Sequence, residues 1–167
     1  ETEIPNYYYS DMARYAPDLI ETQVPVGVDR KGIVNGYIQG GHLELASVEL
    51  ENSEVLSVWK ENSDINFIII TSPKFQDSIE FVLRYREIDY QDLLESATYH
   101  NETDLMEWIF ERVEVGLDMS EVFDQIGKYG VSTSERQYKL LLDQGYTDYT
   151  KMADKVYKKY PVVLSRI

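Results

Sequence analysis

The sequence predicts an α+β fold in which a β-rich N-terminal half, built from antiparallel hairpins, precedes a helical C-terminal half of four to five short helices. Two segments carry the β prediction: the apolar, β-branched run "INFIIITSP" (65–73) and the alternating run "SIEFVLRYREI" (78–88). After Ile88 the apolar residues recur at helical spacing. Because strands and helices are segregated along the chain, α+β is favoured over a parallel βαβ architecture.

The first 62 residues are assigned from local signals. Residues 1–21 are rich in tyrosine and are interrupted by Pro17, so an arm or a short helix is expected there. The segments that follow are an extended stretch at 22–28, a hairpin turn at Asn35-Gly36, a second break at Gly40-Gly41, a bulged strand at 42–50 and a helix at 53–62.

A central hairpin is predicted next. Residues 65–72 and 78–88 are expected to pair as antiparallel strands, with the turn "PKFQD" (73–77) between them. Alternation along the two strands would place four apolar side chains in the core. These are Ile68, Ile70, Phe81 and Leu83.

The C-terminal half is predicted to be helical because capping residues precede runs with apolar side chains three and four positions apart. The predicted helices lie within 89–100, 103–115, 118–130, 132–145 and 148–161, and a tail at 162–167 is expected to return as a strand. The whole chain, 1–167, is treated as a single domain with two possible lobes, 1–88 and 89–167. The sequence shows no flexible linker between the two lobes and no internal repeat.

Composition narrows the classes of function. The chain has no cysteine, so disulfides, thiolate metal sites and a cysteine nucleophile are excluded. Its formal net charge of -14 disfavours direct binding to nucleic acid, whose phosphates it would repel. The charge is uneven: residues 89–124 hold eleven acids and one base, whereas residues 151–167 hold five bases and one acid. We therefore expect acidic and basic helices to lie near each other in one bundle.

The sequence also bears on the cellular location of the chain. No apolar run approaches the roughly 20 residues that span a bilayer, so a soluble chain without a membrane span is expected. The cytoplasm is favoured over an extracellular location, and a processed secreted form stays open because the chain begins at Glu1.

A row of carboxylates marks the segment 103–115. On a helix, Asp104, Glu107, Glu111 and Glu114 would share one face, opposite an apolar face containing Leu105, Met106, Ile109, Phe110 and Val113. Aligned like charges repel, so the row must be solvated, bound to a partner, paired with cations or occupied by a metal. Lys155, Lys158 and Lys159 are the internal cations considered for such pairing.

A metal site would also use His100, but zinc and similar ions usually require two or more imidazole or thiolate ligands. The region offers one histidine, and no calcium-loop pattern is present. We therefore expect no metal and no other cofactor. A metal-dependent hydrolase around His100 is kept as a second alternative.

The triplet Tyr7, Tyr8 and Tyr9 predicts a contact surface. Consecutive side chains point in different directions, so at least one of the three rings is expected to be exposed or covered by another chain. Tyrosine, with a flat apolar ring and a polar tip, is well suited to interfaces. The tyrosines and the carboxylate row together are the candidate partner-binding residues.

These observations favour a non-enzymatic, acidic protein–protein interaction domain, such as an assembly, adaptor or regulatory subunit. The expected partner is a protein, either basic or a second copy of the chain. The first alternative is an acidic DNA-mimic inhibitor that occupies a basic nucleic-acid-binding protein.

Overall fold

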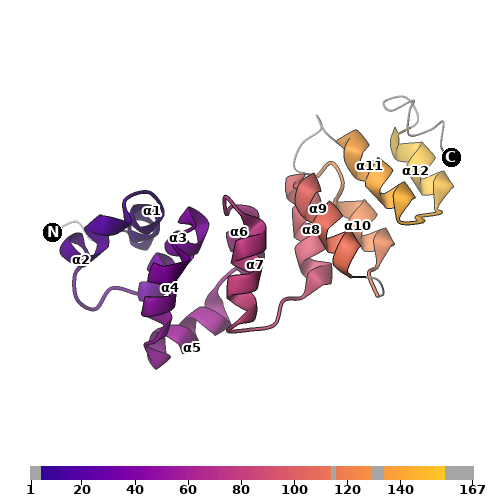
Figure 1. Cartoon of the computed structure of the whole chain (residues 1–167). Helices are drawn as coiled ribbons and strands as arrows, with labels where there is room; N and C mark the ends of the chain where they lie inside the picture. Colours follow the sequence, from indigo (N-terminus) through magenta and orange to yellow (C-terminus); the bar gives the residue numbers. More distant parts are fainter. Residues whose placement is uncertain (1–4, 114–115, 129–133, 157–167) are drawn as a thin grey trace. The chain divides into compact units, whose positions relative to one another are not determined.

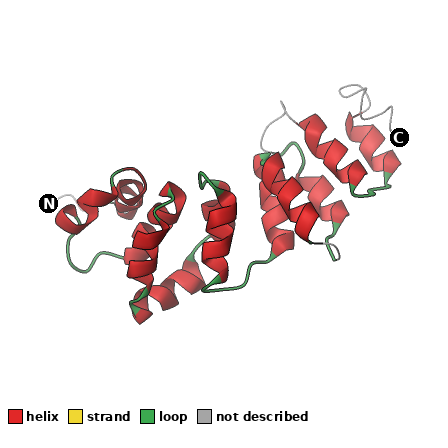
Figure 2. Ribbon diagram, viewed as in Figure 1, coloured by secondary structure: helices red, strands yellow, loops and turns green. Residues whose placement is uncertain are grey.

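The computed structural model describes residues 5–113, 116–128 and 134–156, and the regular structure in this part consists of helices joined by turns and loops (Figure 1). Figure 2 shows no strand in this part. The predicted α+β class and the β-rich N-terminal half are therefore wrong, whereas the helical assignment beyond residue 89 is confirmed within the described residues. The predicted terminal strand at 162–167 lies outside them.

The chain divides into two compact units, residues 1–88 and 89–167, at the position where the sequence changes character. Unit 1 contains α1 (Asn6–Tyr15), the 3-10 turn η1 (Pro17–Leu19), α2 (Ile20–Gln23), α3 (Arg30–Gly40), α4 (Leu43–Leu50), α5 (Ser53–Asn62), α6 (Ile65–Ile70) and α7 (Phe75–Leu83). Unit 2 contains α8 (Tyr90–His100), α9 (Thr103–Arg112), α10 (Met119–Gln125), α11 (Ser134–Asp143) and α12 (Tyr149–Val156). None of the described helices is long and apolar enough to cross a membrane.

Helices α6 and α7 replace the predicted hairpin. Asp64 caps α6, because its side chain accepts a hydrogen bond of 3.1 Å from the Phe67 amide. Burial of Ile65, Ile68 and Ile69 on one side of this helix then outweighs the β propensity of the isoleucines. Ile68 and Phe81 are buried, as predicted. Ile70 is half-buried and Leu83 exposed, because the core faces of α6 and α7 have helical and not alternating spacing.

The predicted turn at Asn35-Gly36 and the predicted strand at 42–50 are both helical as well. Asn35 and Gly36 lie inside α3, and most of 42–50 forms α4. The apolar residues of 42–50 have helical and not strand periodicity, with Ala46 and Leu50 buried four residues apart.

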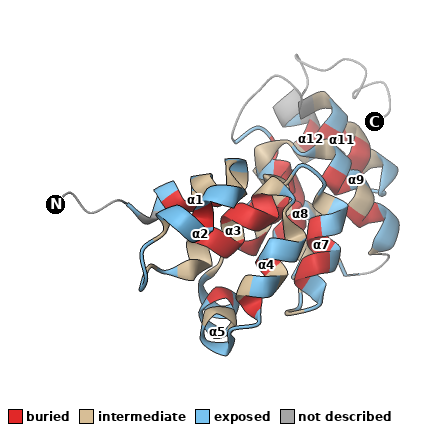
Figure 3. Ribbon diagram, turned by 60° about the vertical axis from the view of Figure 1, so that its left-hand side comes forward, coloured by how far each residue is buried: buried red, intermediate tan, exposed pale blue. Residues whose placement is uncertain are grey.

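Helix α3 is the centre of unit 1. It contacts α1, α4, α5 and α6, and Figure 3 shows it buried along most of its length. It is tied to α5 through Asn35, whose side-chain oxygen accepts hydrogen bonds from Trp59 Nε1 at 2.9 Å and from Ser63 Oγ at 3.1 Å. Trp59 is fully buried, and its ring meets Tyr85 edge to face at 6.1 Å. An aromatic core therefore surrounds a polar link between two helices.

Two glycines let α1 approach α3 closely. A Cβ on Gly36 would collide with the Ser10 carbonyl oxygen and lie 2.9 Å from Ala13 Cβ. A Cβ on Gly40 would lie 2.5 Å from the Arg14 carbonyl oxygen. Gly36 and Gly40 are one turn apart on the same face of α3, so they form a seam without side chains along which α1 packs.

Helix pairs recur at a fixed interval. The helices α3, α6 and α8 end at Gly40, Ile70 and His100, each 30 residues after the last. Each is followed after a short connection by a second helix, α4, α7 or α9. A period of this size is typical of repeat architectures, in which one helix pair cannot bury its apolar face without neighbours.

The turns after α3 and α8 have the same geometry. Gly41 and Asn101 both have a left-handed backbone, with φ of 79° and 63°. The next amides, of His42 and Glu102, each donate to a carbonyl five residues earlier at 2.8 Å. This is the Schellman termination of a helix, which favours glycine and tolerates asparagine.

This equivalence predicts how position 41 responds to substitution. Gly41→Asn should lower the free energy of unfolding less than Gly41→Ala, by about 1 kcal/mol, because asparagine adopts the left-handed region more easily. An added Cβ meets only Pro73 Cγ at 3.5 Å, so packing does not obscure the comparison. Urea denaturation of both variants measures the difference, and equal losses would contradict the equivalence of the two turns.

Unit 2 has its own core. The described helices α8, α9, α10 and α11 contact one another in pairs and bury residues from all four. Phe123 lies between two tyrosine rings, stacked on Tyr146 at 5.1 Å and tilted against Tyr138 at 5.7 Å. Gln137 is buried and donates to the Thr98 carbonyl oxygen at 2.6 Å, which links α11 to α8.

Candidate functional site

The three predicted tyrosines lie in the first turn of α1 and have different environments. Tyr9 points into unit 1 and is 4% exposed, whereas Tyr7 and Tyr8 are 71% and 49% exposed. The prediction that at least one ring is exposed is confirmed. Tyr15 was not among the residues predicted to bind a partner. It is 72% exposed and lies seven residues after Tyr8 on the same side of the helix.

These side chains form a surface that we call the tyrosine face, defined as Tyr7, Tyr8 and Tyr15 together with Asp11. Asp11 is four residues from both Tyr7 and Tyr15 and three from Tyr8, so it lies between the three rings on the helix surface. Its side chain is exposed, and it makes no ion pair with any residue in the described ranges.

The one base in the sequence of α1, Arg14, is directed elsewhere. Its guanidinium donates to the Thr71 carbonyl oxygen at 3.0 Å and lies 5.1 Å from the centre of the Tyr15 ring. The Arg14 carbonyl oxygen is 3.2 Å from His42 Nε2. Arg14 therefore anchors the end of α1 to the rest of unit 1, and it is not among the residues that form the described ion pairs.

The helix is held in this orientation by its opposite side. Tyr9 and Ala13 are buried, and Ala13 packs on the glycine seam of α3. Pro17 begins η1 directly after α1 ends, which fixes the end of the helix. The exposed rings are thus carried on a packed helix and not on a loop.

The carboxylate row lies on α9, as predicted. Asp104, Glu107 and Glu111 are exposed, and the apolar residues Leu105, Met106, Ile109 and Phe110 are buried. Val113 follows the end of the helix and is half-buried, and Glu114 lies outside the described residues. The predicted two-sided character is confirmed for Thr103–Arg112, but the prediction that Val113 is buried on this helix is wrong.

Part of the row is paired within unit 2. Arg136 of α11 contacts both Asp104 and Glu107 at 2.8 Å, and these carboxylates raise the pKa of the guanidinium, chiefly through the hydrogen bond to Asp104. Glu111 has Arg112 beside it at 3.5 Å. Of the lysines considered from sequence, Lys158 and Lys159 lie outside the described residues, and the Lys155 side chain is not described.

The expectation that acidic and basic helices adjoin has a described example in Lys151 of α12, which pairs with Asp124 of α10 at 2.8 Å. Arg136, which pairs with Asp104 and Glu107 of α9, was not predicted from the sequence as a partner of these carboxylates.

Loss of the Arg136 pairs should have a small effect. Arg136→Gln should lower the free energy of unfolding by less than about 1 kcal/mol, because the pairs are exposed and solvent screens them. The difference should shrink further in 1 M salt. Urea denaturation at two salt concentrations measures it, with Lys139→Gln as a control at another exposed pair. A loss above about 3 kcal/mol would mean that the bridge is desolvated in solution.

The two sets of candidate residues belong to different units: the tyrosines to unit 1 and the carboxylates to unit 2. Each set is therefore interpreted separately.

His100 is bound to the backbone of its own helix. Its Nδ1 lies 2.9 Å from the Ser96 carbonyl oxygen, and its ring packs against Tyr99 at 5.0 Å. Within the described ranges, no group of three or more histidines and acids could hold a metal ion. The geometry around His100 therefore gives the hydrolase alternative no further support.

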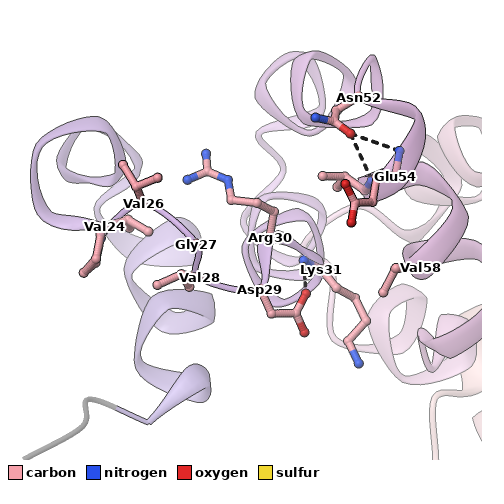
Figure 4. Close-up of a pocket in the computed structure, with 12 residues that line it drawn as sticks. Val24, Val26, Gly27, Val28, Asp29, Arg30, Lys31, Asn52, Glu54 and Val58 are labelled. Carbon is pink, nitrogen blue, oxygen red and sulfur yellow. Dashed lines mark hydrogen bonds between the residues drawn. The ribbon is translucent and has the colours of Figure 1, made fainter.

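A groove in unit 1 lies between the 24–29 loop and the start of α5 (Figure 4). It encloses about 550 Å³. The apolar part of its lining consists of Val24, Val26, Val28, Val55 and Val58. Arg30 and Lys31 supply two positive charges and Asp29 and Glu54 two negative ones. The Arg30 guanidinium is already paired with Glu49, which is not part of the lining, so it is not free to bind an anion in the groove.

The relationship of the chain to known proteins was tested by three comparisons. No family model, no curated protein and no solved structure matches this chain. The surfaces described above are therefore interpreted from their own chemistry.

Proposed function

We propose that this chain is a protein-binding domain and that the tyrosine face of α1 is a contact surface for another polypeptide. The observation that carries the proposal is the gathering of three exposed tyrosine rings on one side of a single packed helix. Aromatic side chains, and tyrosine among them, are enriched in interfaces because they bury a large area while losing little conformational freedom.

The architecture supports this proposal. A helix that is already packed on its opposite side binds without first having to be ordered, which lowers the entropic cost of association.

The DNA-mimic alternative receives less support. A row that imitates phosphates needs carboxylates that are free to meet a basic partner. Asp104 and Glu107 share Arg136, so two members of the row already have a cation.

A site-specific photocrosslinker tests the proposal. Placed at Tyr8, it should capture a distinct protein from an extract of the source cells, or a second copy of the chain. The matched control has the crosslinker at Tyr149, an exposed tyrosine of unit 2. Tyr15→Ser should reduce capture at Tyr8. Identical products at the two positions, or no product at Tyr8, would contradict the proposal.

A further inference from the structure

We infer that the tyrosine face recognises an arginine side chain of the partner polypeptide. This inference rests on the proposed function and adds to it the chemistry of the bound residue. The starting observation is Asp11, an exposed carboxylate placed between Tyr7, Tyr8 and Tyr15 and without an ion pair in the described residues.

The charge around the face favours a cationic ligand. From Pro5 to Gln23 the described segment carries three acids, Asp11, Asp18 and Glu21, all exposed, and one base, Arg14. The Arg14 guanidinium is engaged by the Thr71 carbonyl oxygen, so it does not neutralise Asp11. At the centre of the face a docked cation would find a carboxylate that makes no ion pair within the described residues, and the rings of Tyr7 and Tyr8 beside it; the Tyr15 ring already has the Arg14 guanidinium 5.1 Å from its centre.

The rings favour arginine among cations. A guanidinium is planar, so it can stack on a tyrosine ring while its N–H groups bind a carboxylate at two points. The ammonium of lysine is a compact, strongly hydrated charge that cannot do both. The chain itself contains each element of this contact: Arg112 lies 4.1 Å from the Trp108 ring centre, and Arg30 binds the Glu49 carboxylate at two points, through Nε and Nη2.

A defined peptide tests this inference on the full chain. The probe is an alanine-based helical peptide with two arginines one turn apart. Its counterparts carry two lysines, or two citrullines that keep the planar group but not the charge. NMR titration of the protein amides should give saturable shifts in α1 with the arginine peptide, binding at least about threefold weaker with lysine, and no saturation with citrulline.

Matched variants separate a local contact from the overall negative charge of the chain. Asp11→Asn should weaken arginine-peptide binding by about fivefold or more, whereas Glu80→Gln, an equal change of charge on α7, should weaken it less than about twofold. Tyr15→Leu keeps apolar area without the aromatic ring and should weaken binding by about threefold. Both Asp11 and Tyr15 are exposed, so the variants should retain the helical circular dichroism of the parent.

Equal weakening by Asp11→Asn and Glu80→Gln, or shifts spread outside α1, would overturn arginine recognition. If the crosslinker at Tyr8 still captured a protein, binding by the tyrosine face would stand without the arginine contact. If it captured nothing while the peptide bound as expected, the proposed function would fail and the local affinity for arginine would stand.

Discussion

Replacing Trp59 by alanine should lower the free energy of unfolding of unit 1 by about 3–5 kcal/mol. The side chain is fully buried and contacts Tyr85, so its removal leaves a cavity between α5 and its neighbours. It also leaves the Asn35 side-chain oxygen with Ser63 as its remaining donor. Denaturant unfolding followed by circular dichroism measures the loss.

The hydrogen bond between Trp59 and Asn35 can also be tested from the asparagine side. Asn35→Ala should cost about 1–3 kcal/mol, because the indole N–H of Trp59 is then buried without its acceptor. The double variant should lose less than the sum of the two single losses, since both remove the same hydrogen bond. Val58→Ala, on the exposed side of α5, is the control and should cost less than about 1 kcal/mol. A Trp59→Ala loss as small as that of the control would mean that the tryptophan is solvated.

Replacing Gly36 by alanine should destabilise unit 1 by about 1–3 kcal/mol, although alanine is the better helix former. The new Cβ would collide with the Ser10 carbonyl oxygen, a backbone atom that moves only if α1 moves. Gly36→Val should cost more than Gly36→Ala, because it adds bulk and β-branching at the same contact.

Amide hydrogen exchange shows which helices the Gly36→Ala substitution loosens. In Gly36→Ala, exchange in α1 should accelerate more than in α7, which is not among the helices that contact α1 most. The result that would refute the prediction is a gain in stability of about 1 kcal/mol, the value expected from helix propensity at an unhindered position.

The helical C-terminal half could be predicted because its signals agree with one another. Asp89 and Asp118 cap α8 and α10 with their side chains, and the buried residues of α9 recur at three- and four-residue steps. Local propensity, capping and apolar periodicity all indicate helix there.

The N-terminal half was assigned wrongly because two local signals have other causes in this fold. Asn35-Gly36 favours a hairpin turn, but here the asparagine is a hydrogen-bond acceptor between helices and the glycine is a point of close contact with α1. The isoleucines of α6 favour a strand, but their burial in a helical unit decides the conformation. The 30-residue period was missed because the turn positions that mark it carry different residues, Gly41, Thr71 and Asn101.

The candidate site was predictable only in part. Exposure within the tyrosine triplet follows from side-chain direction, and so does the two-sided α9. The seven-residue spacing of Tyr8 and Tyr15 could have extended the tyrosine face once α1 was taken as a helix. The pairing of Arg136 with α9 depends on tertiary structure, and no local pattern indicates it.

The ten residues of α1 have two sides under different constraints. The side that includes Ala13 packs on the glycine seam of α3, where there is no room for added atoms. Mutations that enlarge a side chain at this contact, on α1 or on α3, are therefore expected to be removed by selection for folding. The side that carries Tyr7, Tyr8 and Tyr15 is largely free of contacts within unit 1, so mutations there can accumulate at little cost in stability. A lineage could therefore change what this helix meets outside the protein while the scaffold beneath it stays the same, which makes α1 a favourable place for new specificity to evolve.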